Sequence, residues 1–371
     1  MKLSIRLILA FALSLTALGV AVAQDDMEEA TIEGTVRMAR ANWDTGFFQA
    51  EVFDSLLTEL GYEVERTGTI AADLFYQAVA EGEDVDMWAN GWLPLHVNFL
   101  TAEGVIGEAI PVGFQVEAGA LQGYLVDKAT ADEFGITNIM DMTDPEIAAI
   151  FDNDDDGRAE LTGCNPGWGC EGVIEDTLDT LELRDSIDHV QGEYSLLMQD
   201  TIGRYERGEP IFFYTWTPNW TVGELALGED VVWIEAPGDE LGVDATPNVP
   251  GCVDDPCSMG FQGNDIRAVG NTEFLMENPA VAALMSQITI PLADIAAQNQ
   301  LMRDGADSPD DIEAQAAAWI ESNRDTVDEW LTFARENADN TELVEEALNS
   351  FMDQYVETAE MEEDMSEGDE G

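Results

Sequence analysis

Three tryptophans lie within two residues of proline or glycine, where the sequence predicts that strands end and loops begin. They are Trp92, Trp168 and Trp216. In open α/β sheets ligands bind beyond the carboxyl ends of strands, so we expect the three rings to converge on one cleft. An indole face attracts a cation by roughly 0.5–2 kcal/mol, even when the cation cannot donate a strong hydrogen bond. The pattern therefore predicts a site for a methylated ammonium group.

Core packing is the alternative role for each of the nine tryptophans. We assign Trp233, Trp319 and Trp330 to packing, because each lies within a strand-like or helix-like segment. Trp43 follows the first predicted strand, where a loop could face the same cleft, and is a further candidate for the ligand site.

The N-terminal residues have the features of a secretory signal peptide. Lys2 and Arg6 precede an apolar run, residues 7–22, that is short for a membrane span, and we expect cleavage after Ala23. The mature chain is therefore predicted to be exported to a periplasm-like space.

Four cysteines form two pairs that are close in sequence, Cys164 with Cys170 and Cys252 with Cys257. In an exported chain this spacing favours two short disulfide loops. Zinc ligation is the rival interpretation. The sequence has two histidines and no Cys-x-x-Cys, so we expect neither a metal nor another cofactor.

The segment between Cys164 and Cys170 predicts a second part of the site, which would bind a negatively charged group. If the sulfurs pair, they close a tight loop just before an amphipathic helix. Gly169 and Cys170 would then present unpaired backbone N–H groups at the helix N-terminus, where a carboxylate is favoured. A lone histidine is more often structural, but His96 lies four residues after Trp92, and we expect it to donate a further hydrogen bond.

Apolar residues recur with the periods of alternating strands and helices. Residues 35–92 are predicted to form strand, helix, strand, helix and strand, the pattern of a parallel α/β sheet. A second α/β set includes strands predicted at 210–214 and 231–234, and helices are predicted at 310–324 and 326–337.

We therefore predict an α/β fold with two lobes and a ligand cleft between them. Residues 30–122 would form the first part of lobe I, 123–265 lobe II, and 266–345 the return segment of lobe I. Residues 357–371 contain eight acids and no base, and we predict that they form a disordered tail.

Acidic residues far outnumber basic ones along the chain. Removal of the signal peptide leaves 12 of the 14 Lys and Arg against 77 Asp and Glu, a net charge of −65. This charge repels nucleic acid, which we exclude as a partner. We interpret it as a halophilic adaptation, because in about 1 M salt the screening length is roughly 3 Å and carboxylates stop repelling each other. We expect the fold to loosen in dilute buffer, and equal melting temperatures in low and molar NaCl would contradict this.

The segments around the three tryptophans resemble those of a known family. WLPLH (92–96), LTGCNPGWGCEG (161–172) and FYTWTP (213–218) are similar to segments of the periplasmic glycine betaine/proline betaine-binding proteins of ABC osmoprotectant importers. The second segment is the most specific, and a weaker likeness extends from about residue 34 to 337.

The resemblance implies a type II periplasmic-binding-protein fold, whose two lobes close over the ligand. By position, the three tryptophans would surround the trimethylammonium group, and the carboxylate would meet the backbone N–H groups of Gly169 and Cys170 and the side chain of His96. The implied function is capture of glycine betaine or proline betaine by a monomer that is not an enzyme. The ligand would be delivered to an ABC permease and its ATPase. Trp43 departs from the family pattern and leaves the exact ligand preference open. Ectoine-like solutes are a further alternative.

Two rival functions carry different expectations. A choline receptor would use the same aromatic box but would have no use for a carboxylate-binding helix end. A secreted hydrolase would need a nucleophile with a positioned base, and neither G-x-S-x-G nor a phosphate loop occurs. His189 lies in a polar stretch and is predicted to be exposed.

Residues 152–157, DNDDDG, match the opening of a calcium-binding loop. Asp152, Asp154 and Asp156 occupy positions one, three and five, but position twelve is Gly163 instead of a bidentate Glu. We therefore favour a solvated turn over a calcium site. Calcium binding that Asp154→Ala abolishes would reverse this interpretation.

Overall fold

The computed structural model describes residues 32–356, and the predicted signal peptide and acidic tail lie outside this range. The strands, in chain order, are β1 (Thr35–Ala41), β2 (Glu63–Ile70), β3 (Met87–Leu93), β4 (Ala109–Asp127), β5 (Ala159–Thr162), β6 (Ile187–Val190), β7 (Phe212–Thr217), β8 (Val231–Ile234) and β9 (Asn264–Asn271). The α-helices are α1 (Phe47–Leu60), α2 (Ala72–Glu81), α3 (Val97–Leu100), α4 (Lys128–Phe134), α5 (Pro145–Phe151), α6 (Gly169–Thr180), α7 (Tyr194–Glu206), α8 (Thr221–Glu224), α9 (Gly238–Leu241), α10 (Thr272–Glu277), α11 (Pro279–Gln287), α12 (Leu292–Arg303), α13 (Pro309–Ser322), α14 (Arg324–Glu336) and α15 (Glu342–Phe351). Shorter helical turns are η1 (Asp44–Gly46), η2 (Ile139–Thr143) and η3 (Met352–Val356).

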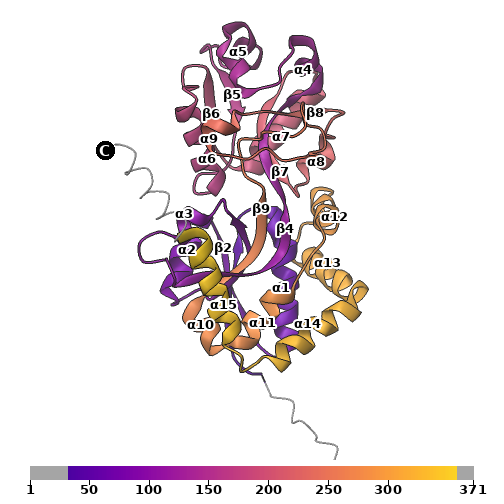
Figure 1. The fold of residues 1–371 in the computed structure, drawn as a ribbon. Coiled ribbons are helices and arrows are strands. Elements are labelled where there is room, and N and C mark those ends of the chain that lie inside the picture. The colour runs from indigo at the N-terminus through magenta and orange to yellow at the C-terminus, as the bar shows by residue number, and fades with distance from the viewer. Residues whose placement is uncertain (1–31, 357–371) are drawn as a thin grey trace, which may run out of the picture. The chain divides into compact units, whose positions relative to one another are not determined.

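Two strands, β9 and the long β4, lie between two groups of strands in the sheet (Figure 1). The sheet order is β2-β1-β3-β9-β4-β7-β5-β6, and β8 also pairs with β4. Residues 109–120 of β4 run antiparallel to β9, whereas residues 121–127 run antiparallel to β7, and 124–127 also to β8. One strand therefore passes from the first group, β1 to β3, into the second group, β5 to β8.

The predicted periodicities correspond to the observed elements. The apolar positions of α1, spaced four residues apart from Phe48 to Leu60, are all buried, and the helix ends at Gly61, whose φ of 125° favours glycine. The first strands, β1 and β2, are parallel as predicted. The strand predicted at 231–234 is β8, whereas the one predicted at 210–214 begins two residues later as β7.

The predicted lobe boundaries, 122/123 and 265/266, fall inside β4 and β9. Each of these strands pairs with neighbouring strands on both sides of the predicted boundary. Strand alternation in a sequence does not show where one partner strand gives way to another, because the period of two continues unchanged.

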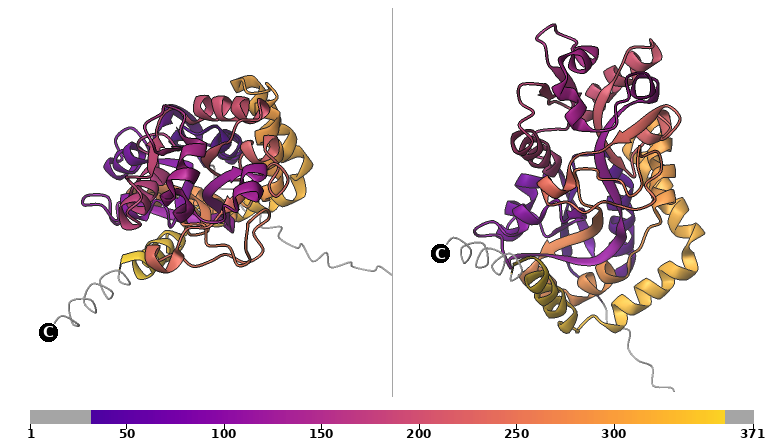
Figure 2. Two further views of the ribbon diagram at one scale, coloured as in Figure 1. Left: turned by 90° about the horizontal axis from the view of Figure 1, so that it is seen from above. Right: turned by 45° about the horizontal axis from the view of Figure 1, so that its top comes forward.

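The C-terminal helices return to the first group of strands. Helix α13 packs against α1, α14 against α11, and α15 against β4. Figure 2 shows this part of the chain, orange to yellow, passing around the outside of that group. Among the described residues no single helix is long and apolar enough to cross a membrane. Helices α11 and α12 have the length and apolar composition of a membrane span only when they are taken together, and the angle between them is 94°.

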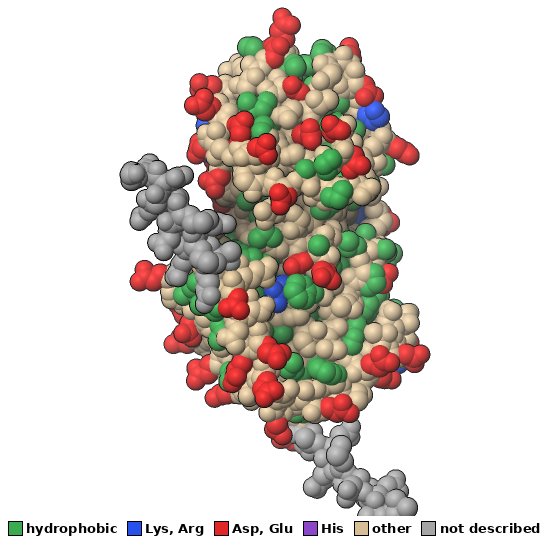
Figure 3. All heavy atoms as spheres, viewed as in Figure 1, with side chains coloured by type: hydrophobic (Ala, Val, Ile, Leu, Met, Phe, Trp, Pro, Cys, Tyr) green, Lys and Arg blue, Asp and Glu red, His purple; other side chains and the backbone are tan. Residues whose placement is uncertain are grey.

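Both predicted disulfides are present, Cys164–Cys170 and Cys252–Cys257. Acidic side chains are scattered over the face shown in Figure 3, with few basic ones among them. The basic residues in the described range contact acids, carbonyl oxygens or aromatic rings. Arg324, for example, binds Glu59 and Asp328. Most of the negative charge therefore has no local counterion from the protein.

Candidate ligand-binding site

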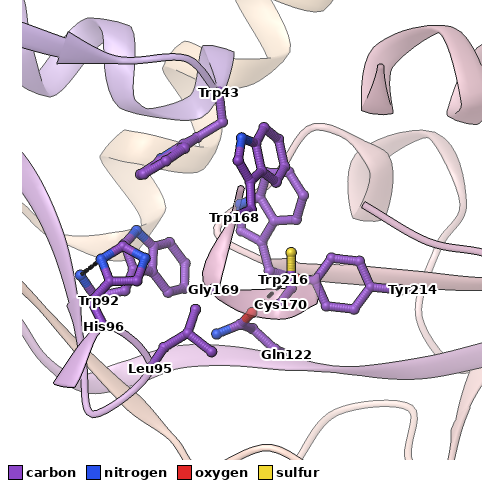
Figure 4. A pocket seen from close by; sticks show the side chains of 10 residues that line it. All are labelled: Trp43, Trp92, Leu95, His96, Gln122, Trp168, Gly169, Cys170, Tyr214 and Trp216. Carbon is purple, nitrogen blue, oxygen red and sulfur yellow. Dashed lines mark hydrogen bonds between the residues drawn. The ribbon is translucent and has the colours of Figure 1, made fainter. Parts of the chain in front are cut away.

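A pocket lies where the ends of β3 and β7 and the start of α6 meet the loop after β1 (Figure 4). All seven residues predicted to contact a ligand line this pocket together with three others. The lining residues are Trp43, Trp92, Leu95, His96, Gln122, Trp168, Gly169, Cys170, Tyr214 and Trp216.

Three of the four indole rings stand edge to face. The ring centroids of Trp43 and Trp168 are 5.5 Å apart at 75°, and those of Trp168 and Trp216 are 5.6 Å apart at 80°. Such rings form adjoining walls at nearly right angles, and Trp92 lies across the pocket from Trp216 (Figure 4). All four side chains are buried, at 3–7% exposure.

One buried side chain fixes two of these rings. Asn90 Oδ1 accepts hydrogen bonds from Trp43 Nε1 at 2.7 Å and from Trp92 Nε1 at 2.9 Å. Asn90 lies in β3 two residues before Trp92, so alternate residues of the strand share the pocket face. The amide therefore sets the orientation of a ring on its own strand and of one in the loop after β1.

The loop after β1 fixes the other two rings. Trp168 Nε1 donates to Asn42 Oδ1 at 2.6 Å, and Trp216 Nε1 donates to Thr45 Oγ1 at 3.3 Å. Every indole N–H of the four pocket tryptophans thus has a protein partner. The rings present π faces to the pocket, and their donors are already in use.

The first turn of α6 supplies free backbone donors. Gly169 and Cys170 are its first two residues, so their N–H groups have no carbonyl in a preceding turn of the helix. The Cys164–Cys170 disulfide ties this turn to the segment after β5. A Cβ atom on Gly169 would lie 2.7 Å from Leu95 Cγ and 3.0 Å from His96 Cδ2, so the close approach of His96 requires glycine here.

His96 is a neutral donor with a defined tautomer. Its Nδ1 accepts the backbone N–H of Trp92 at 3.2 Å and lies 2.9 Å from the Tyr76 hydroxyl. Because a backbone N–H can only donate, Nδ1 is unprotonated and the ring proton is on Nε2. Burial lowers the pKa of His96 from 6.5 to about 3, so the ring is uncharged at neutral pH.

Sequence reasoning did not single out Leu95, Gln122 or Tyr214. Leu95 lies inside the 92–96 segment. Tyr214 lies two residues before Trp216, so the period of a strand could have placed Tyr214 on the same face. Gln122 lies within β4 and carries no such signal.

The prediction that His189 is exposed is wrong. The side chain is 3% exposed, and its Nδ1 lies 2.6 Å from Glu175 Oε1. Strand β6 pairs His189 with Leu161 of β5, and a Cβ on Gly163 would lie 1.9 Å from His189 Nε2. The polar neighbours of His189 in sequence did not reveal that α6 covers this end of the strand. His189 does not line the pocket.

The structure brings Asp152, Asp154 and Asp156 together, with carboxylate oxygens within 4.8 Å of one another. Asp152 accepts backbone N–H groups, among them that of Gly157 at 2.8 Å, and Asp156 pairs with Arg158. These bonds are typical of an Asx-type turn. The preference for a solvated turn over a calcium site stays a prediction.

Comparisons with known proteins identify the family of this chain. Residues 34–322 match the family model described as the substrate binding domain of ABC-type glycine betaine transport system. The glycine betaine/proline betaine-binding periplasmic protein of Escherichia coli strain K12 is 41% identical over 287 residues, which cover 77% of this chain and 86% of that protein.

Solved structures confirm the predicted two-lobed periplasmic-binding-protein fold. An ABC-transporter choline binding protein in complex with choline superposes with a TM-score of 0.64 at 19% identity, covering 85% of this chain and 98% of that one. Lactococcal OpuAC in its closed-liganded conformation with glycine betaine gives 0.61 at 19% identity, covering 80% and 99%. The chain therefore belongs to the family of substrate-binding domains of ABC-type glycine betaine transport systems.

Proposed function

We propose that this protein captures glycine betaine or proline betaine and delivers it to an ABC importer. One observation carries the proposal: four indole rings and the free N–H groups at the start of α6 line the same pocket. A zwitterion with a methylated nitrogen at one end and a carboxylate at the other matches both.

The aromatic end suits a quaternary ammonium group. Such a group cannot donate a strong hydrogen bond, but its positive charge is attracted to the π faces of aromatic rings. A desolvated indole face contributes about 2 kcal/mol. The indole N–H groups donate to Asn90, Asn42 and Thr45, so their positive ends are directed at protein oxygens and the ring faces are left for the cation.

The polar end suits a carboxylate held by neutral donors. None of the described residues that line the pocket is Asp, Glu, Lys or Arg, and His96 is uncharged. A ligand whose own charges cancel enters such a pocket without a buried counterion. A cation such as choline would leave the pocket with an uncompensated charge, and this favours a betaine over choline.

A role in transport follows from the family, and we further propose how the protein reaches and serves its importer. The chain would be exported, cleaved after about Ala23, and act as a monomer that docks on a permease driven by an ATPase. Two disulfides suit the oxidising periplasm. The protein would bind its ligand without turnover.

A ligand panel tests this proposal. The purified protein is titrated in high salt with glycine betaine, proline betaine, choline, proline and carnitine while tryptophan emission is followed. We expect saturable binding of a betaine that is tighter than binding of choline, with ligand recovered unchanged. Tighter binding of choline, or release of a product, would overturn the proposal.

A further inference from the structure

A second kind of donor faces the same pocket from β4. The side chain of Gln122 is buried, at 2% exposure, and lines the pocket. Its Oε1 accepts the hydroxyl of Tyr214 at 2.6 Å, whereas its Nε2 has no hydrogen-bond partner among the described residues. A buried amide without a partner for its donors is uncommon and calls for an acceptor.

Sheet register holds this amide in place. Gln122 pairs with Trp216, and Tyr124 pairs with Tyr214, so Gln122 and Tyr214 are diagonal neighbours on one face of the antiparallel pair. Burial raises the pKa of Tyr214 well above 10, so its hydroxyl keeps the proton that it donates to Oε1. With Oε1 held by Tyr214, the amide turns Nε2 the other way. Figure 4 shows the amide nitrogen pointing toward Leu95, on the side of the pocket opposite Trp43.

We propose that Gln122 Nε2 donates a hydrogen bond to the anionic end of the ligand and that Tyr214 is the residue that positions it. The inference rests on the proposed function, since it takes the ligand to be a zwitterion with a carboxylate. It adds a strand side chain to the donors from α6 and from His96.

Of the two charged groups of a betaine, only the carboxylate can accept a hydrogen bond from Gln122 Nε2. A quaternary ammonium group has no lone pair and cannot accept from Nε2. A carboxylate has two oxygens with about four acceptor sites, enough for Gly169, Cys170, His96 and Gln122 together. The hydroxyl of choline offers one oxygen. Gln122 therefore discriminates a betaine from an alcohol that carries the same cation.

Gln122→Glu is the sharpest test, because it keeps the shape and the acceptor for Tyr214 but replaces the donor with a negative charge. At pH 7.5 we expect glycine betaine to bind about 10- to 100-fold more weakly, as for loss of a charge-assisted hydrogen bond. Choline binding should stay the same or tighten. Equal losses for both ligands, or unchanged betaine binding, would overturn the inference.

A pH series separates the proposed contact from a packing effect. Position 122 is buried, and burial raises the pKa of a carboxyl group, so we expect the carboxylate introduced by Gln122→Glu to take up a proton and become a donor again when the pH is lowered from 7.5 to 5. The betaine affinity of this variant should therefore recover, while that of the wild type stays flat. A pH-independent loss in Gln122→Glu would contradict the proposal.

Matched variants keep the test decisive. Gln122→Met removes the donor without adding charge, and we expect about a tenfold loss for betaine with choline retained. This variant decides the question if Gln122→Glu fails to fold. Tyr214→Phe frees the amide to rotate, and we expect a few-fold loss for betaine only. If the wild type binds no betaine, the proposed function itself fails. If the wild type binds betaine and both Gln122 variants match it, only the role of Gln122 fails.

Discussion

The N–H groups at the two ends of the pocket differ in whether they already have hydrogen-bond partners in the protein. At the aromatic end each indole N–H donates to Asn42, Thr45 or Asn90, and the rings are left with their faces. At the polar end the backbone donors of Gly169 and Cys170 have no partner in the preceding turn. The N–H donors thus have protein partners at the end that would meet the ammonium group, which cannot accept a hydrogen bond. They are free at the end that would meet the carboxylate, which can.

The two ends also differ in how they are held. The rings depend on side-chain hydrogen bonds between distant parts of the chain, whereas the polar end is a turn of helix closed by a disulfide. Substitutions at the polar end should therefore separate betaine from choline, and substitutions at the aromatic end should weaken both.

Gly169→Ala should have the largest effect on betaine. The new Cβ would crowd Leu95 and His96, and overpacking of this kind costs about 1–3 kcal/mol. We expect roughly 10- to 100-fold weaker betaine binding by calorimetry and a smaller change for choline. Gly172→Ala is the matched control in the same helix, because its Cβ would meet nothing within 4 Å. A similar loss in both variants would show that helix effects, not the pocket, are measured.

Trp168→Ala should weaken betaine and choline alike. This ring contacts both Trp43 and Trp216, so its removal opens a wall of the box. We expect a loss of about 1–2 kcal/mol for each ligand, the contribution of a desolvated indole face. Trp168→Phe should recover part of it. Wild-type betaine affinity in the alanine variant would refute the role of this ring.

His96 should make folding stability, but not betaine binding, depend on pH. Its folded pKa of about 3 lies below the ordinary 6.5, so below pH 6.5 the unfolded chain takes up a proton that the folded protein cannot accommodate. His96 should therefore cost about 1.4 kcal/mol of stability for each pH unit between 6.5 and its folded pKa.

Urea unfolding at pH 7.5, 6.5 and 5.5 measures this slope, with His96→Gln as the reference that lacks it. Betaine affinity of the wild type should stay flat over the same range, because the ring remains a neutral donor. Identical slopes in the two proteins would mean that His96 titrates normally.

Asn42→Ala should have the smallest effect. The variant removes the acceptor of Trp168 Nε1 but leaves the ring face, and the freed N–H lies in a partly buried position that water can reach. We expect a loss below about 1 kcal/mol for both ligands, the net value of one neutral hydrogen bond. A loss as large as that of Trp168→Ala would mean that the ring contributes only when Asn42 holds its orientation.

Much of the fold and of the site could be predicted from the sequence. The period of α1, the parallel pair β1 and β2, and strand β8 follow from local apolar patterns. The tryptophans at strand ends and loops, and Gly169 with Cys170, are likewise local signals, and the structure gathers them in one pocket. The pairing of the four cysteines was readable from their spacing as well.

What the sequence could not show depends on contacts between distant segments. Asn90 and Asn42 are unremarkable polar residues until the indoles that they orient are in place. Gln122 gains its meaning from register with β7, and His189 is covered by a helix that its neighbours in sequence do not reveal. The passage of β4 from one group of strands to the other is a matter of strand pairing as well.

The loop after β1 has a kinetic consequence. Its Asn42 and Thr45 accept from indoles 126 and 171 residues further along the chain, across the groups of strands that β4 and β9 join. If the two groups of strands separate to release a ligand, these two protein–protein hydrogen bonds must break as well, and they would then add to the barrier to escape. We therefore expect Asn42 and Thr45 to lengthen the residence time of the ligand although neither lines the pocket.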